Sequence, residues 1–64
     1  MWDWAIGMPL SMILDAAMKN QRNVFVVREL QTTGRALRYK CEMQAGDLAV
    51  EVCGGKITDI WMVE

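Results

Sequence analysis

Histidine is absent from this chain of 64 residues, and proline, tyrosine and phenylalanine occur only once each. Without histidine the chain lacks the commonest general base and zinc ligand, and it also has no Gly-rich phosphate loop. Glu51 and Asp59 come close together in one of the strand registers considered below. We interpret that pair as part of a solvated or salt-bridged face. We therefore expect no catalysis, no metal ion and no cofactor.

Cysteine and long hydrophobic runs are also scarce. Cys41 and Cys53 are too few for a disulfide framework or a zinc site. No run of about 18 apolar residues is present, so we expect no membrane span and no membrane partner. The first residues lack the basic region of a signal peptide. Together these absences predict an intracellular, reducing location, the cytoplasm.

Basic and acidic residues are nearly equal in number, but they are unevenly distributed along the chain. The net charge of −1 gives no field that would steer the protein to nucleic acid. Residues 19–40 nevertheless carry six basic side chains against one acidic side chain, and residues 41–64 carry one basic side chain against five acidic ones. A folded sheet can pair these two blocks and cancel them.

The patterns that are present predict one small α+β domain spanning residues 1–64. Residues 1–8 form an apolar N-terminal segment without a period. Residues 9–21 place apolar side chains at helical spacing after Pro9, which suits the first helical position. Residues 23–63 contain four strand-like runs separated by short gaps that contain glycine. We expect one N-terminal helix packed on a four-stranded antiparallel β-meander, in the order α-β-β-β-β.

Two-residue turns at 33–34 and 45–46 predict a strand register in which apolar side chains share one face. These turns place Glu29 opposite Arg38 and Lys40 opposite Glu51, so that opposite charges meet on the other face. The expected core face contains Val24, Val26, Leu30, Leu37, Tyr39, Cys41, Met43, Leu48, Val50 and Val52. Arg28 is expected on this face as well, opposite Tyr39. Cys53 is expected on the opposite face from Cys41.

The last strand, residues 57–63, is apolar on both faces and allows two registers. A two-residue loop at Gly54-Gly55 turns Ile57, Trp61 and Val63 inward. A bulged loop turns Ile60 and Met62 inward and places Asp59 opposite Glu51. Because a strand with one buried face should alternate, we expect the second face to be covered by another copy of the chain or by another protein.

This uncovered face leads to the main functional hypothesis. The expected interface residues are Phe25, Val27, Ile60, Trp61 and Met62, since a contiguous exposed apolar patch usually marks an interaction surface. An alternative is that the N-terminal segment folds back over the same face. We interpret the chain as a non-catalytic interaction module that forms a homodimer or docks on a protein partner. Its small size suggests a viral (phage-type) or plasmid-type accessory or inhibitor protein that occupies a host protein surface.

The second hypothesis is a binder of nucleotides or nucleic acid. Two tryptophans, Trp2 and Trp4, can stack on bases. Basic side chains interleaved with an aromatic residue are a pattern found in nucleic-acid-binding sheets. The residues expected to contact such a ligand are Trp2, Trp4, Arg28, Arg35, Arg38 and Lys40.

Overall fold

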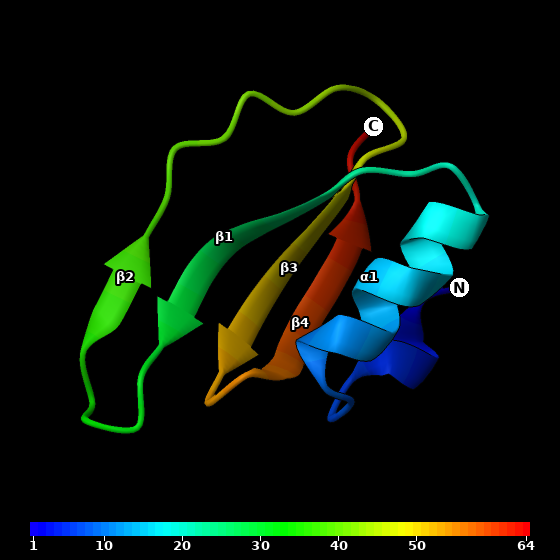
Figure 1. Ribbon diagram of the computed structural model, residues 1–64. Coiled ribbons are helices and arrows are strands. Elements are labelled where there is room, and N and C mark those ends of the chain that lie inside the picture. The colour runs from blue at the N-terminus through cyan, green and yellow to red at the C-terminus, as the bar shows by residue number, and fades with distance from the viewer.

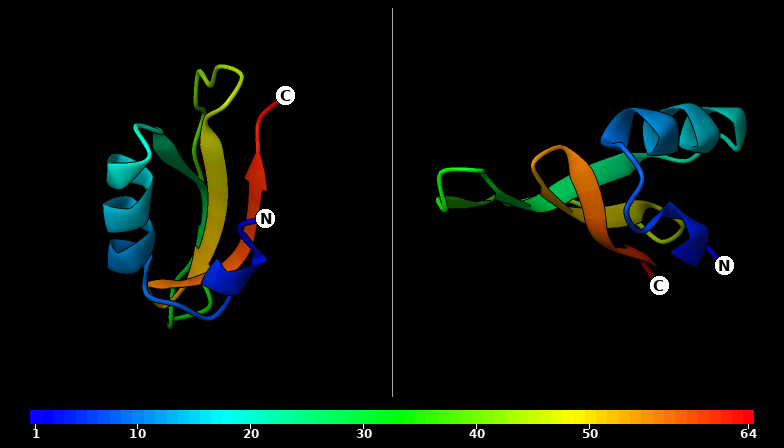
Figure 2. Two further views of the ribbon diagram at one scale, coloured as in Figure 1. Left: turned by 90° about the vertical axis from the view of Figure 1, so that its right-hand side faces the viewer. Right: turned by 90° about the horizontal axis from the view of Figure 1, so that it is seen from below.

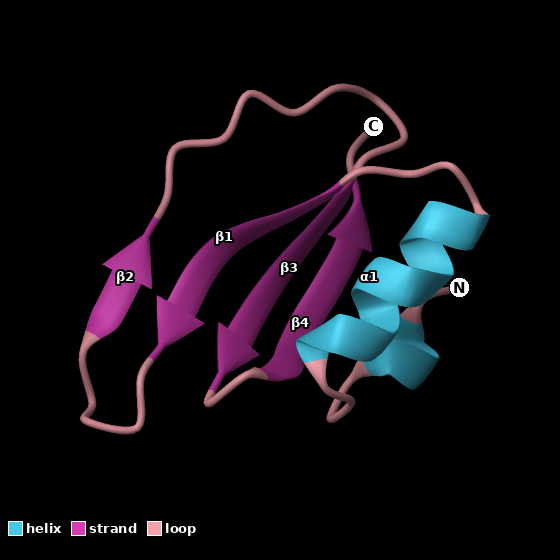
Figure 3. Cartoon of the chain, in the orientation of Figure 1, coloured by secondary structure: helices cyan, strands magenta, loops and turns pink.

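A computed structural model describes all residues, 1–64. It contains a short 3₁₀ helix, η1 (Asp3–Ala5), one α-helix, α1 (Leu10–Lys19), and four strands. The strands are β1 (Val24–Leu30), β2 (Ala36–Arg38), β3 (Leu48–Cys53) and β4 (Lys56–Met62). The four strands form one sheet, and α1 lies on one side of it (Figures 1 and 3). The α+β class and the single N-terminal helix are confirmed.

Local sequence explains where α1 begins and ends. Pro9 immediately precedes the helix with an extended backbone, and its missing N–H removes one donor that the first turn cannot satisfy. After Lys19 the Nδ2 group of Asn20 donates to the carbonyl of Ala16, and Gln21 adopts a left-handed φ of 55° that stops the helix. No helix in the structure is long and apolar enough to cross a bilayer.

The sheet is mixed, so the prediction of a purely antiparallel meander is wrong. The strand order is β2-β1-β3-β4, and β1 pairs with β3 in parallel. After β2 the chain passes over the start of β1 and enters β3 on its other side (Figure 1). The run from Val24 to Val27 is apolar on both faces, which suits a central strand. β2 instead carries Arg38, and Arg35 precedes it, so it is a short edge strand with charged side chains.

The first hairpin has a three-residue loop, Thr32 to Gly34, instead of the predicted two-residue turn. Gln31 N–H donates to the Arg35 carbonyl at 2.8 Å, and Gly34 has the positive φ of 90° that such a loop requires. Arg28 therefore lies opposite Arg38, and Glu29 lies opposite Leu37. The predicted pairing of Glu29 with Arg38 is wrong.

A bulge at Val27 changes the faces of the second half of β1. The register with β3 shifts between Val26 and Arg28, so one residue is unpaired there. Such an insertion turns the following side chains to the opposite faces. Leu30, predicted for the core, consequently shares a face with Cys53, its partner in β3. Arg28 also leaves the predicted core face.

The last hairpin combines features of both predicted registers. Cys53 pairs with Lys56 across the two-residue turn at Gly54-Gly55, and Asp59 still lies opposite Glu51. A register shift between these two pairs makes this possible. As a result Ile57 and Ile60 both enter the core, and Trp61, opposite Ala49, points to the other face.

The core lies between α1, η1 and the β3–β4 half of the sheet. Its buried residues are Ala5, Ile13, Val50, Val52, Ile57 and Ile60, and Trp2, Leu10, Val24 and Val26 pack against them. Residues 7–10 run along the outer edge of β4, where Gly7 N–H donates to Ile57 O and Ile57 N–H donates to Met8 O. The N-terminal segment therefore lies at the edge of the sheet and does not cross the face turned away from α1 (Figure 2).

Candidate interaction surface on the back of the sheet

The face of the sheet turned away from α1, here called the back face, carries an apolar row. Phe25 lies opposite Ala49 in β3, and Ala49 lies opposite Trp61 in β4. Phe25 is half-buried and Trp61 is 40% exposed, whereas the small Ala49 between them is completely buried. Ala49 is therefore screened from solvent within the chain, between two aromatic side chains.

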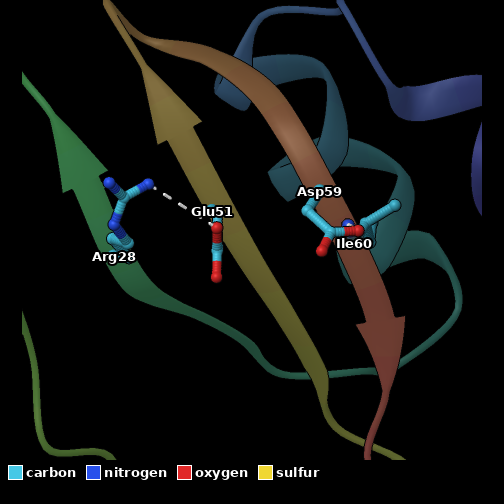
Figure 4. Close-up of polar contacts among 4 residues, drawn as sticks. All are labelled: Arg28, Glu51, Asp59 and Ile60. Atoms are coloured by element: carbon cyan, nitrogen blue, oxygen red, sulfur yellow. Dashed lines mark hydrogen bonds and ion pairs between the residues drawn. The ribbon is translucent and has the colours of Figure 1, made fainter.

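A belt of four charged residues crosses the back face next to this row. Strand pairing places Arg38 beside Arg28, Arg28 beside Glu51, and Glu51 beside Asp59. We call these four residues the charged belt. Figure 4 shows Arg28, Glu51 and Asp59 on one face of the sheet, with the helix behind it. The belt is positive on the β2–β1 side and negative on the β3–β4 side.

The charges of the belt are only partly satisfied within the chain. A nitrogen of the Arg28 guanidinium lies 3.8 Å from Glu51 Oε1, while Arg28 Nε is buried without a hydrogen-bond partner. Arg38 has no ion-pair partner. Asp59 Oδ1 accepts a hydrogen bond from the backbone N–H of Ile60 at 2.9 Å. The predicted Lys40–Glu51 ion pair does not form, because β2 and β3 are not neighbours.

The predicted interface residues are divided between the two faces. Phe25 and Trp61 lie on the back face, and Val27 is at the bulge of β1. Ile60 is instead buried in the core, and Met62 pairs with the fully buried Leu48 on the helix side. The bulge in the last hairpin explains this division, since it turns Ile57, Ile60 and Met62 to the same side.

The residues predicted to bind a nucleotide are not brought together. Trp2 and Trp4 lie beside β4, with ring centroids 5.9 Å apart, and Trp2 packs against the core. The residues Arg35, Arg38 and Lys40 lie in and around β2, at the opposite edge of the sheet. Arg28 belongs to the charged belt. A ligand that contacted both groups would have to span all four strands.

Sequence reasoning missed an apolar groove on the helix side of β1. Its volume is about 450 Å³, and seven of its nine lining residues are hydrophobic, among them Leu10 and Val24 and also Phe25, which therefore borders the groove as well as the back face. Its polar groups are Glu29 and Tyr39, whose hydroxyl donates to Glu29 Oε1 at 3.2 Å. Partial desolvation, this hydrogen bond and the negative charge of Glu29 raise the pKa of Tyr39. The groove depends on the bulge at Val27, which turns Glu29 to this face and has no sequence signal of its own.

Comparisons with known proteins do not assign a function to this chain, so the functional argument depends on the geometry of its surface. No family model, no curated protein and no solved structure matches this chain. No group of three or more cysteine or carboxylate side chains lies close enough together to hold a metal ion.

Proposed function

We propose that this chain is a non-catalytic protein-interaction module that docks through the back face of its sheet. The observation that carries the proposal is the apolar row of Phe25, Ala49 and Trp61, which lies beside the charged belt on the face turned away from α1. A partly exposed tryptophan beside polar side chains is the usual composition of an interface anchor and its rim.

The two edges of the sheet support docking by a face over docking by strand addition. At one edge β2 is only three residues long and bears Arg38. At the other edge residues 7–10 pair with the start of β4, and the Asp59 carboxylate accepts a hydrogen bond from the backbone N–H of Ile60. Short, charged or covered edge strands oppose the addition of another strand. The back face has no comparable protection.

Photo-crosslinking tests this proposal. A benzophenone amino acid placed at Trp61 should crosslink to protein when the chain is expressed in cells. The same probe at Met18, which is 74% exposed on the outer side of α1, serves as the matched control and should not crosslink. The crosslinked protein is then identified and purified, and its binding should be lost with Phe25→Ser and kept with Met18→Ser. Equal crosslinking from both positions, or none from position 61, would contradict the proposal.

The groove on the helix side favours a second candidate function, the binding of a small apolar ligand. Its volume lies within the range of about 300–1,000 Å³ found for ligand sites. Glu29 and Tyr39 would orient a donor group on such a ligand. A screen of small apolar compounds, followed by amide chemical shifts, tests this candidate. Binding should perturb Val24, Val26 and Tyr39 together, and Glu29→Gln should weaken it.

A further inference from the structure

We infer that the partner covering the back face is a second copy of this chain, related by a two-fold axis parallel to the strands. This inference rests on the proposed function and identifies its partner. The axis passes between β1 and β3, so that β1 of one copy lies over β3 of the other, and β2 lies over β4.

The charged belt selects this arrangement. Rotation about an axis parallel to the strands places Arg38 over Asp59 of the second copy, and Arg28 over Glu51 of the second copy. Rotation about an axis across the strands would instead place Arg38 over Arg38 and Asp59 over Asp59, which is repulsive. A belt that runs from positive to negative across the sheet is therefore complementary to itself in only one of the two orientations. Arg38, which has no ion-pair partner within its own chain, gains one in the dimer.

The apolar row fits the same rotation. Phe25 of one copy comes over the Ala49 position of the other, and the two Phe25 side chains lie on either side of the axis. Two sheets packed face to face interdigitate in this way, with their strand directions within about 30° of each other. The second Glu51 carboxylate also brings an acceptor toward Arg28, whose Nε has no partner within its own chain.

Charge reversal tests the inference with purified protein. Arg38→Asp and Asp59→Arg each place like charges over one another in the homodimer, so each variant should raise the dissociation constant about tenfold or more. An equimolar mixture of the two variants restores opposite charges at both contacts. It should therefore form a mixed dimer of about wild-type stability, visible by sedimentation velocity and as one chain of each kind by native mass spectrometry. Arg35→Asp, immediately before β2 and outside the belt, is the matched control and should leave the dimer unchanged.

A second measurement does not depend on these substitutions. In the proposed dimer the two Cys53 side chains lie on facing sheets near the axis, about 10 Å apart. With Cys41→Ser leaving a single thiol, a short bismaleimide should link Cys53 to Cys53 in a product of twice the chain mass.

Three results would overturn the inference. They are a wild-type chain that stays monomeric at high concentration, a mixture of variants that fails to dimerise, and the absence of the Cys53 crosslink. The proposed function is decided separately by the crosslinks from position 61. If a different protein is crosslinked at position 61 and the wild-type chain is monomeric, the proposed interaction function would stand and the homodimer would be rejected.

Discussion

In the half of the molecule formed by α1, β3 and β4, side chains are closed off from solvent, whereas no residue of β1 or β2 is buried. β1 is nevertheless a central strand, with neighbours on both sides. Its seven residues are all half-exposed because the core under α1 is built on β3 and β4, and nothing covers its back face. A strand in the centre of a sheet can therefore have its backbone paired on both sides while its side chains stay partly exposed. We place the proposed interaction surface on this more exposed half of the sheet.

The largest expected difference between the two halves is the effect of valine truncation. Val26 and Val50 are paired neighbours on the helix side, but Val50 is fully buried and Val26 is half-exposed. Val50→Ala should lower the free energy of unfolding by about 2–3 kcal/mol, and Val26→Ala by roughly half as much. Urea unfolding of both variants in the Arg38→Asp background separates this effect from dimerisation. Equal losses would show that the β1 half is as tightly packed as the core.

Glycine substitution gives the next largest difference. Gly46 and Gly34 have similar positive φ angles of 94° and 90°, so alanine is strained at both positions. At Gly46 a Cβ would also lie 3.3 Å from Arg22 Nη1, which donates to the Gly46 carbonyl, whereas the space around Gly34 is open. Gly34→Ala should cost about 1 kcal/mol and Gly46→Ala about 1–2 kcal/mol in thermal unfolding. A larger loss at Gly34 would contradict the comparison.

Amide hydrogen exchange should show the same asymmetry without any substitution. β2 is a three-residue edge strand with exposed ends, whereas β3 is paired on both sides and almost entirely buried. We expect the β2 amides to exchange at least about tenfold faster than those of β3, since the first hairpin can open locally. Equal protection in both strands would indicate that the sheet opens only as one cooperative unit.

The smallest effect concerns the only tyrosine. The pKa of Tyr39 is raised, so the neutral phenol is favoured in the folded state. The associated stability is present below the ordinary tyrosine pKa of about 10 and is lost as the pH rises through the folded value. A titration of tyrosinate absorbance should therefore have a higher midpoint in the wild type than in Glu29→Gln. Identical midpoints would mean that Glu29 does not act on Tyr39.

Much of the secondary structure was predictable because its signals are local. Pro9 and the helical spacing after it place the helix, and the glycine pair at 54–55 places the last turn. The pairing of Glu51 with Asp59 also followed from one of the two predicted registers. Strand order was not predictable in the same way, because the choice between β1 and β2 as the neighbour of β3 depends on which strand buries more apolar surface.

The back face was predicted as the interaction surface, but its composition was only partly predicted. Phe25 was placed there from alternation alone, and Trp61 was placed there in only one of the two predicted registers of the last strand. Ile60 was misplaced, and the charged belt was missed, because the faces reverse at the bulges in β1 and β4. A bulge is one unpaired residue, and its position is decided by how the two strands fit together, which no single strand encodes.

By itself, the sequence determined the helix, the approximate positions of the strands and an excess of apolar side chains that one small core does not bury. Hydrophobic period, proline and glycine act within a few residues, so they can be read along the chain. Only the tertiary structure decided the parallel pairing of β1 with β3, the two bulges and hence the row of Arg38, Arg28, Glu51 and Asp59. Each of these depends on contacts between residues far apart in the sequence, where burial and backbone pairing are optimised together.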